Sequence, residues 1–220
     1  TFKPDGILTG HPDVITAFRR RLRRHIPGVV LDFNDPKGRR VADAVVMCDE
    51  CEIGETAAEH FINRGFRHFA FAGIEGEGAG DTPVRRSQKH EEGFRRRLAR
   101  DGFGFAPYRE RLIRCVRHYS DIERLTAFLR DIPTPCALFA TSDMIAQSVV
   151  FACRKVGVAV PERLVVLGVN DESTVCENTT PTLSSIAPDY VGAGYRAAEI
   201  LDRLLRCGKA PRKTFYGVRR

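Results

Sequence analysis

Short apolar runs alternate with amphipathic segments along the whole chain. The apolar runs lie at residues 6–8, 28–31, 44–47, 69–72, 136–140 and 164–169. They are rich in β-branched and aromatic residues and do not alternate with polar positions, which is typical of parallel strands covered on both faces. Because helical patterns separate them, the sequence predicts a layered α/β fold with parallel sheets flanked by helices.

Proline and glycine mark where the intervening helices begin and end. Helices are expected at about residues 12–25, 56–64, 144–155 and 191–206. Pro12 stands near the start of the first, and Gly65 and Gly157 stand where a left-handed cap would end the second and third.

Residues 74–83 form the one clear glycine-rich segment, between a strand and a helix. Gly76, Gly78 and Gly80 miss both the dinucleotide-binding and the P-loop spacing, and Pro83 is expected to delay the helix. A loop or a lobe connection is therefore favoured over a nucleotide site.

The composition of the chain narrows its class. It has 220 residues, 43% of them hydrophobic, no apolar run of membrane-spanning length and no signal-like start. We therefore expect a cytoplasmic protein that does not contact a membrane.

The net charge of +7 raises the question of nucleic-acid binding. However, the arginine clusters at 19–24, 85–86 and 95–100 are interspersed with apolar positions, as on solvated helix faces. No zinc-finger, helix-turn-helix or RNP pattern accompanies them, so direct DNA contact is not expected.

The cysteines offer one alternative chemistry. Seven scattered cysteines favour reduced thiols, but Cys48 and Cys51 form a C-x-x-C after a strand, as in thiol redox proteins. Neighbouring carboxylates would raise rather than lower a thiol pKa, and no second pair completes a zinc site. Since no G-x-S-x-G is present either, neither an enzyme nor a metal site is expected.

Polar side chains directly follow two of the later apolar runs. Asp143 comes soon after 136–140, and Asn170 and Asp171 come after 164–169. The carboxyl ends of parallel strands form the ligand crevice of open α/β sheets, and amide and carboxylate groups suit sugar hydroxyls. Asp143 could equally be the N-cap of the next helix, whereas a ligand role is favoured for Asn170.

Several stretches together resemble the type I periplasmic-binding-protein fold of LacI-type repressors, and more closely the sensor of XylR-type xylose activators of the AraC family. They lie at residues 4–8, 57–71, 160–172, 176–189 and 194–201. The most specific is VPERLVVLGVNDE at 160–172.

This resemblance implies two lobes with a sugar effector between them. Residues 1–72 and 187–214 would form the N-terminal lobe and residues 73–186 the C-terminal lobe. The family's sensor has a further strand-helix-strand unit before the strand at 6–8, and a DNA-binding module. Neither is expected within this chain.

The resemblance also points to effector contacts. His90 falls where the family usually has an arginine three residues before a Gly-Phe pair, and Asn170 falls where it usually has aspartate. The full expected set is Asp143, Asn170, His90, Arg86, His11 and Asp171. The two departures broaden the expected effector from xylose to a pentose-like monosaccharide.

The sequence thus predicts the effector-binding domain of a sugar-metabolism regulator, working without a cofactor as a homodimer. DNA would be bound only through a module outside this chain. The alternatives are a solute-binding protein for sugar uptake on the same fold, and a thiol redox protein using Cys48 and Cys51.

Overall fold

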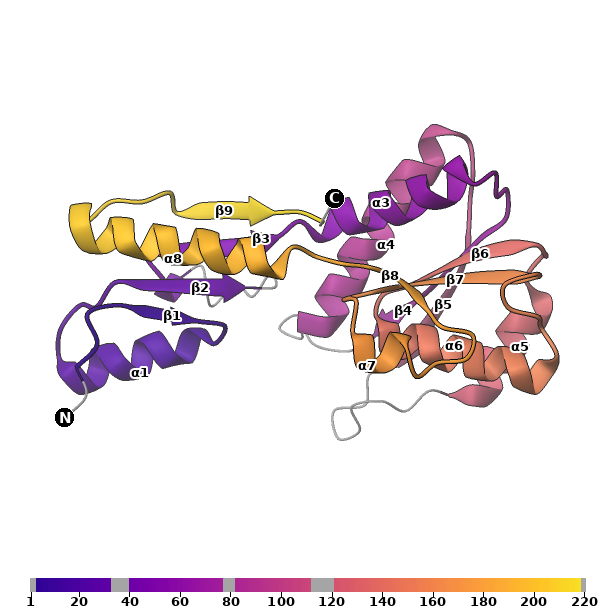
Figure 1. Ribbon diagram of the computed structural model, residues 1–220, viewed down its shortest axis with the longest axis horizontal. Coiled ribbons are helices and arrows are strands. Elements are labelled where there is room, and N and C mark those ends of the chain that lie inside the picture. Colours follow the sequence, from indigo (N-terminus) through magenta and orange to yellow (C-terminus); the bar gives the residue numbers. More distant parts are fainter. Residues whose placement is uncertain (1–2, 33–39, 77–81, 112–120, 219–220) are drawn as a thin grey trace. The chain divides into compact units, whose positions relative to one another are not determined.

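The computed structural model describes residues 3–32, 40–76, 82–111 and 121–218. Two compact units are present: unit 1 comprises Thr1–Asp49 and Asp189–Gly217, and unit 2 comprises Glu50–Pro188 and Val218–Arg220. Each contains a parallel sheet flanked by helices, which confirms the predicted fold class (Figure 1).

Unit 1 is built on a four-stranded sheet in the order β1-β2-β3-β9. Its elements are β1 (Ile7–Thr9), α1 (Pro12–Leu22), β2 (Gly28–Asp32), β3 (Ala44–Cys48), α8 (Tyr190–Cys207) and β9 (Lys213–Tyr216). Val29 and Val30 point to opposite faces of the sheet and are both fully buried, so both faces are covered. Helices α1 and α8 provide this cover.

Unit 2 is built on a five-stranded sheet in the order β5-β4-β6-β7-β8. The strands are β4 (Phe69–Glu75), β5 (Ala106–Arg111), β6 (Cys136–Ala140), β7 (Leu164–Val169) and β8 (Ser184–Ile186). The helices are α3 (Glu50–Asn63), α4 (Thr82–Arg100), α5 (Ile122–Asp131), α6 (Asp143–Val156) and α7 (Ser173–Cys176).

Two glycines allow α3 and α4 to pack backbone to backbone. A Cβ added to Gly54 would collide with the main chain at His90, and one added to Gly93 would collide with the main chain at Cys51. An aromatic core lies beside this crossing, where the rings of Phe94 and Phe139 are 5.3 Å apart. The crossing places the first turn of α3 against the middle of α4.

The expected helix ends are partly confirmed. Gly65 and Gly157 have the positive φ values of left-handed caps, 84° and 71°. However, the second helix begins at Glu50 instead of residue 56, because Glu50 and Ile53 already pack inward. Likewise α4 begins at Thr82, before Pro83, since proline fits the first turn of a helix.

The division between the two units differs from the expected lobe boundaries. It lies at Asp49 and Glu50 instead of residue 72, and at Pro188 and Asp189 instead of residue 186. Two interactions explain the first difference: α3 packs on α4, and β4 pairs with both β5 and β6.

Candidate functional site

A cavity of about 340 Å³ opens at the carboxyl ends of β4, β6 and β7 in unit 2. It is lined by Ile74, Pro83, Arg86, Ser87, Thr141, Ser142, Met144, Asn170 and Glu172. Its volume falls within the range of small-molecule pockets. Its position is the one expected for the ligand crevice of an open α/β sheet.

Two of the predicted residues line this cavity and contact each other. Arg86 reaches from α4, and its Nη2 donates to Oδ1 of Asn170 across 3.3 Å. Asn170 directly follows β7 and has a φ of 112°, a backbone conformation that asparagine adopts more readily than most residues. The structure thus brings a guanidinium and an amide together at the predicted edge.

His90 does not line the cavity but is fully buried behind it. Its Nε2 lies 2.6 Å from Oε2 of Glu50, and Oε1 of Glu50 lies 3.2 Å from Nε of Arg86 in an ion pair without hydrogen-bond alignment. Burial lowers the pKa of His90, although the adjacent Glu50 carboxylate opposes the lowering. His90 therefore supports Arg86 through Glu50.

Asp143 is also fully buried and is absent from the cavity lining. Its Oδ2 accepts the backbone N–H of Glu172 at 2.8 Å, and its Oδ1 accepts the hydroxyl of Ser185 at 2.6 Å. Burial raises the pKa of Asp143, opposed by these two hydrogen bonds. The carboxylate thus anchors the turn that carries Asn170 and Glu172.

The alternative reading of Asp143 as a helix N-cap is wrong. Ser142 is the N-cap of α6, and its Oγ accepts the N–H of Ile145 at 3.3 Å. Asp143 is the first helical residue, and its side chain is turned toward the chain beyond β7 instead of toward its own helix.

The remaining two predicted residues have other surroundings. Asp171 is exposed with a φ of 55°, and its N–H donates to Ser185 Oγ at 3.0 Å. His11 is the exposed N-cap residue of α1 in unit 1, where its N–H donates to Thr9 Oγ1. An effector contact by His11 stays a prediction.

Several cavity residues are absent from the predicted set, and four of these are polar: Ser87, Thr141, Ser142 and Glu172. Ser87 follows Arg86 on α4, and the other three lie within two residues of Asp143 or Asn170 at the same strand ends. The Thr141 hydroxyl is buried with no hydrogen-bond partner among the described residues. It is therefore available to a ligand that enters the cavity.

The alternative chemistries find no geometric support. Within residues 3–32, 40–76, 82–111 and 121–218, no disulfide joins the cysteines and no cluster of three metal-ligating side chains occurs. Cys115 and residues 77–81 of the glycine-rich segment lie outside the described residues. None of the described helices is long and apolar enough to cross a membrane.

The model of the periplasmic binding protein-like domain family matches residues 58–218, most of the chain. This chain belongs to that family. The matched region contains every residue that lines the cavity, including the strand ends at which the sequence predicted ligand contacts.

Two curated proteins with similar sequences are transcription regulators. The xylose operon regulatory protein of Haemophilus influenzae is 24% identical over 202 residues, covering 82% of this chain and 51% of the relative. The HTH-type transcriptional regulator GntR of Pseudomonas aeruginosa is 32% identical over 211 residues, covering 93% and 57%. The chain thus spans about half the length of these relatives.

Solved structures agree on the fold. The xylose-binding transcription activator xylR has a TM-score of 0.74 at 22% identity, covering 98% of this chain and 56% of the other. A LacI family transcriptional regulator from Enterococcus faecium with bound ribose has a TM-score of 0.70 at 21% identity, covering 98% and 76%. The periplasmic binding protein-like fold predicted from the sequence is thereby confirmed.

Proposed function

We propose that this chain is the effector-binding domain of a sugar-responsive transcription regulator, with a pentose-like monosaccharide as the effector. The observation that carries the proposal is the cavity at the carboxyl ends of β4, β6 and β7. Two solved structures of similar fold, one named xylose-binding and one holding bound ribose, support the sugar class.

The lining suits a neutral sugar. Arg86 donates hydrogen bonds, Glu172 accepts them, and the Asn170 amide can do both, so each sugar hydroxyl can be met in either role. Ile74, Pro83 and Met144 provide an apolar surface for the C–H face of a sugar ring. Because Arg86 is already paired with Glu50, the Glu172 carboxylate leaves the lining without a positive surplus, which favours an uncharged ligand over a sugar phosphate.

Binding would act on gene expression by favouring one conformation of the full-length protein over another. This requires different sugar affinities for the two conformations. We propose that the full-length protein is a cytoplasmic homodimer. The conformational change would pass to a DNA-binding module outside this chain, as the names of the relatives suggest.

The direct experiment is a thermal melt of the chain with a panel of pentoses and hexoses at millimolar concentration. At least one pentose should raise the melting temperature, because a ligand that binds only the folded state stabilises it by mass action. No shift with any sugar of the panel would overturn the proposal.

Thr141→Val tests the cavity itself. The substitution keeps the shape but removes a buried hydroxyl without a described partner, so the melting temperature without sugar should stay level or rise. The dissociation constant for the sugar should increase by about tenfold, the effect of one lost hydrogen bond. Thr56→Val, on α3 and outside the cavity, is the matched control and should leave sugar binding unchanged.

A further inference from the structure

The excess positive charge of the chain is concentrated in one of its two units. Unit 1 contains 15 Lys and Arg against 9 Asp and Glu, a net charge of +6, whereas unit 2 contains 20 against 19, a net charge of +1. In unit 2 the arginines at the end of α4 face carboxylates: Arg96 and Arg100 pair with Glu55, and Arg97 pairs with Asp101. The surplus of unit 1 therefore needs an explanation of its own.

Within unit 1 the charges separate along the strand direction. All four strands are parallel, so they begin at one edge of the sheet and end at the other (Figure 1). Asp13, Asp49 and Asp189 lie at the edge where strands end. The edge where strands begin, which we call the basic edge, carries six cations against the two carboxylates of Asp5 and Asp43; the cations are Arg23, Arg24, Arg40, Lys209, Arg212 and Lys213.

A cleft of about 610 Å³ lies at the basic edge, beside the end of α8. Its charged lining consists of Arg19, Arg40, Lys209 and Arg212 together with a single carboxylate, that of Asp43. The lining thus holds four cations against one anion.

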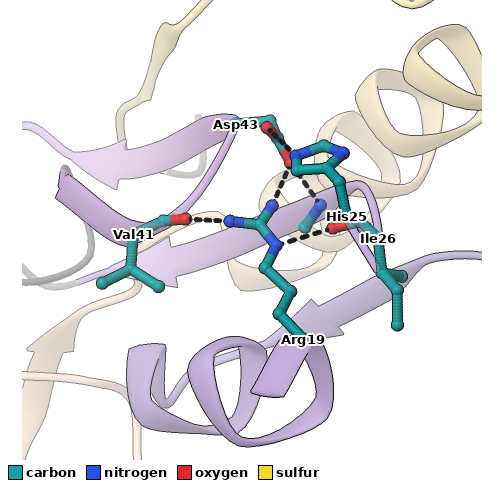
Figure 2. A network of polar contacts seen from close by, with 6 residues as sticks. Arg19, His25, Ile26, Val41 and Asp43 are labelled. Carbon is teal, nitrogen blue, oxygen red and sulfur yellow. Dashed lines mark hydrogen bonds and ion pairs between the residues drawn. The ribbon is translucent and has the colours of Figure 1, made fainter. Parts of the chain in front are cut away.

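Asp43 is fully engaged by its own surroundings (Figure 2). Its Oδ2 accepts from Arg19 Nη2 at 2.5 Å and from the N–H of Gly28 at 2.7 Å, and its Oδ1 lies 3.0 Å from Nε2 of His25. Arg19 in turn donates to the carbonyls of Val41 and Ile26. This network neutralises Arg19 and engages both oxygens of the Asp43 carboxylate.

Arg40, Lys209 and Arg212 are exposed, and no carboxylate of the described residues lies within ion-pair distance of any of them. Attraction to the negative end of a helix could account for Lys209, just beyond α8. It does not account for Arg212, which directly precedes β9 and whose carbonyl accepts the N–H of Val45. Three cations in one cleft, with no ion-pair partner among the described residues, point to an external anion.

We propose that the basic edge of unit 1 binds the phosphate backbone of DNA, next to the site held by the DNA-binding module of the full-length protein. Four strands span ~14 Å at a spacing of ~4.8 Å, and B-DNA places a phosphate every ~3.4 Å along each strand. The edge is therefore long enough for Arg40, Lys209 and Arg212 each to contact a phosphate, without reading base sequence. The choice of DNA among polyanions rests on the proposed regulator function.

The test measures fluorescence anisotropy of a labelled random-sequence duplex as this chain is added at low salt. With three phosphate contacts, the affinity should fall about 40-fold between about 50 and 200 mM salt. Arg40→Gln/Lys209→Gln/Arg212→Gln should flatten this salt dependence to near zero. Arg130→Gln/Lys155→Gln/Arg163→Gln removes the same charge from exposed positions of unit 2 and should leave it unchanged.

Three outcomes would overturn the proposal. They are no anisotropy change at low salt, equal losses in the two triple variants, and displacement of DNA by polyglutamate as effectively as by unlabelled duplex, which would indicate an acidic protein as the partner. Sugar-induced melting shifts should be the same in both variants. A chain that fails to bind sugar yet binds DNA through the basic edge would refute the proposed effector and leave this inference standing.

Discussion

The imidazole of His90 and the carboxylate of Glu50 form a fully buried pair, with Nε2 and Oε2 2.6 Å apart. Because burial lowers the pKa of His90, the ring is neutral at pH 7 and its Nε2–H donates to the carboxylate. Nδ1 is then a buried acceptor with no partner among the described residues. The charge of Glu50 is balanced by Arg86 instead, so the three side chains are neutral together.

Removing Glu50 should destabilise the fold strongly. Glu50→Ala leaves the imidazole and the partly buried Arg86 guanidinium without their anion, and breaking a buried pair in this way typically costs about 3 kcal/mol or more. Urea denaturation should show a lower free energy of unfolding. Glu59→Ala, at an exposed position of the same helix, should change it by less than about 0.5 kcal/mol. Equal effects of the two substitutions would contradict the assigned role of Glu50.

The same pair predicts how stability depends on pH. In the unfolded chain His90 titrates near 6.5, and in the folded chain its pKa is lower. As the pH falls below about 6.5, the unfolded chain takes up a proton that the folded chain does not, so the free energy of unfolding decreases. Above that pH the contribution is constant.

His90→Gln isolates this contribution, because glutamine can still donate to Glu50 but does not titrate. Between pH 6.5 and the folded pKa, the wild type should lose up to about 1.4 kcal/mol per pH unit more than the variant. His68→Gln, at an exposed position, should retain the wild-type dependence. Parallel stability curves for wild type and His90→Gln would exclude a depressed pKa at His90.

The crossing of α3 and α4 gives a third prediction. In Gly93→Ala the new methyl group meets the carbonyl of Cys51, which is main chain and cannot turn aside. The free energy of unfolding should drop by about 3 kcal/mol, the upper range for overpacking. Gly104→Ala has open space around the added methyl group and serves as the control. A stable Gly93→Ala variant with unchanged Phe94 packing would show that the two helices can separate.

The sequence was most informative about the central strands. Runs such as 136–140 and 164–169 are buried on both faces and are therefore apolar throughout. The strands it missed, β5, β8 and β9, are all at sheet edges. They include polar positions such as Arg109 and Ser184 because one side of an edge strand meets solvent, so the apolar pattern is lost.

The candidate site was predictable in position and less so in detail. Asn170 follows a predicted strand and lies in the cavity lining, at the strand ends where a ligand crevice was expected. However, the position of a residue at a strand end does not determine which way its side chain points. Asp143 turns to the chain after β7, and Glu50 lies 40 residues from His90 in sequence. Pairings over such separations leave no local periodicity, so only the folded structure reveals them.

A substitution of Asp143 tests whether its carboxylate anchors the turn after β7 or contacts the ligand directly. Asp143→Ala removes the acceptor of both the Glu172 N–H and the Ser185 hydroxyl, and the loss of these two partly buried, charge-assisted hydrogen bonds should lower the free energy of unfolding by about 2–3 kcal/mol. Ser185→Ala breaks one of these contacts, together with the exposed hydrogen bond from the Asp171 N–H, and should cost about 1 kcal/mol. Sugar affinity, measured by calorimetry, should also fall, because the turn that carries Asn170 and Glu172 loses its anchor. If Asp143→Ala instead abolished sugar binding at unchanged stability, the carboxylate would have to contact the ligand itself.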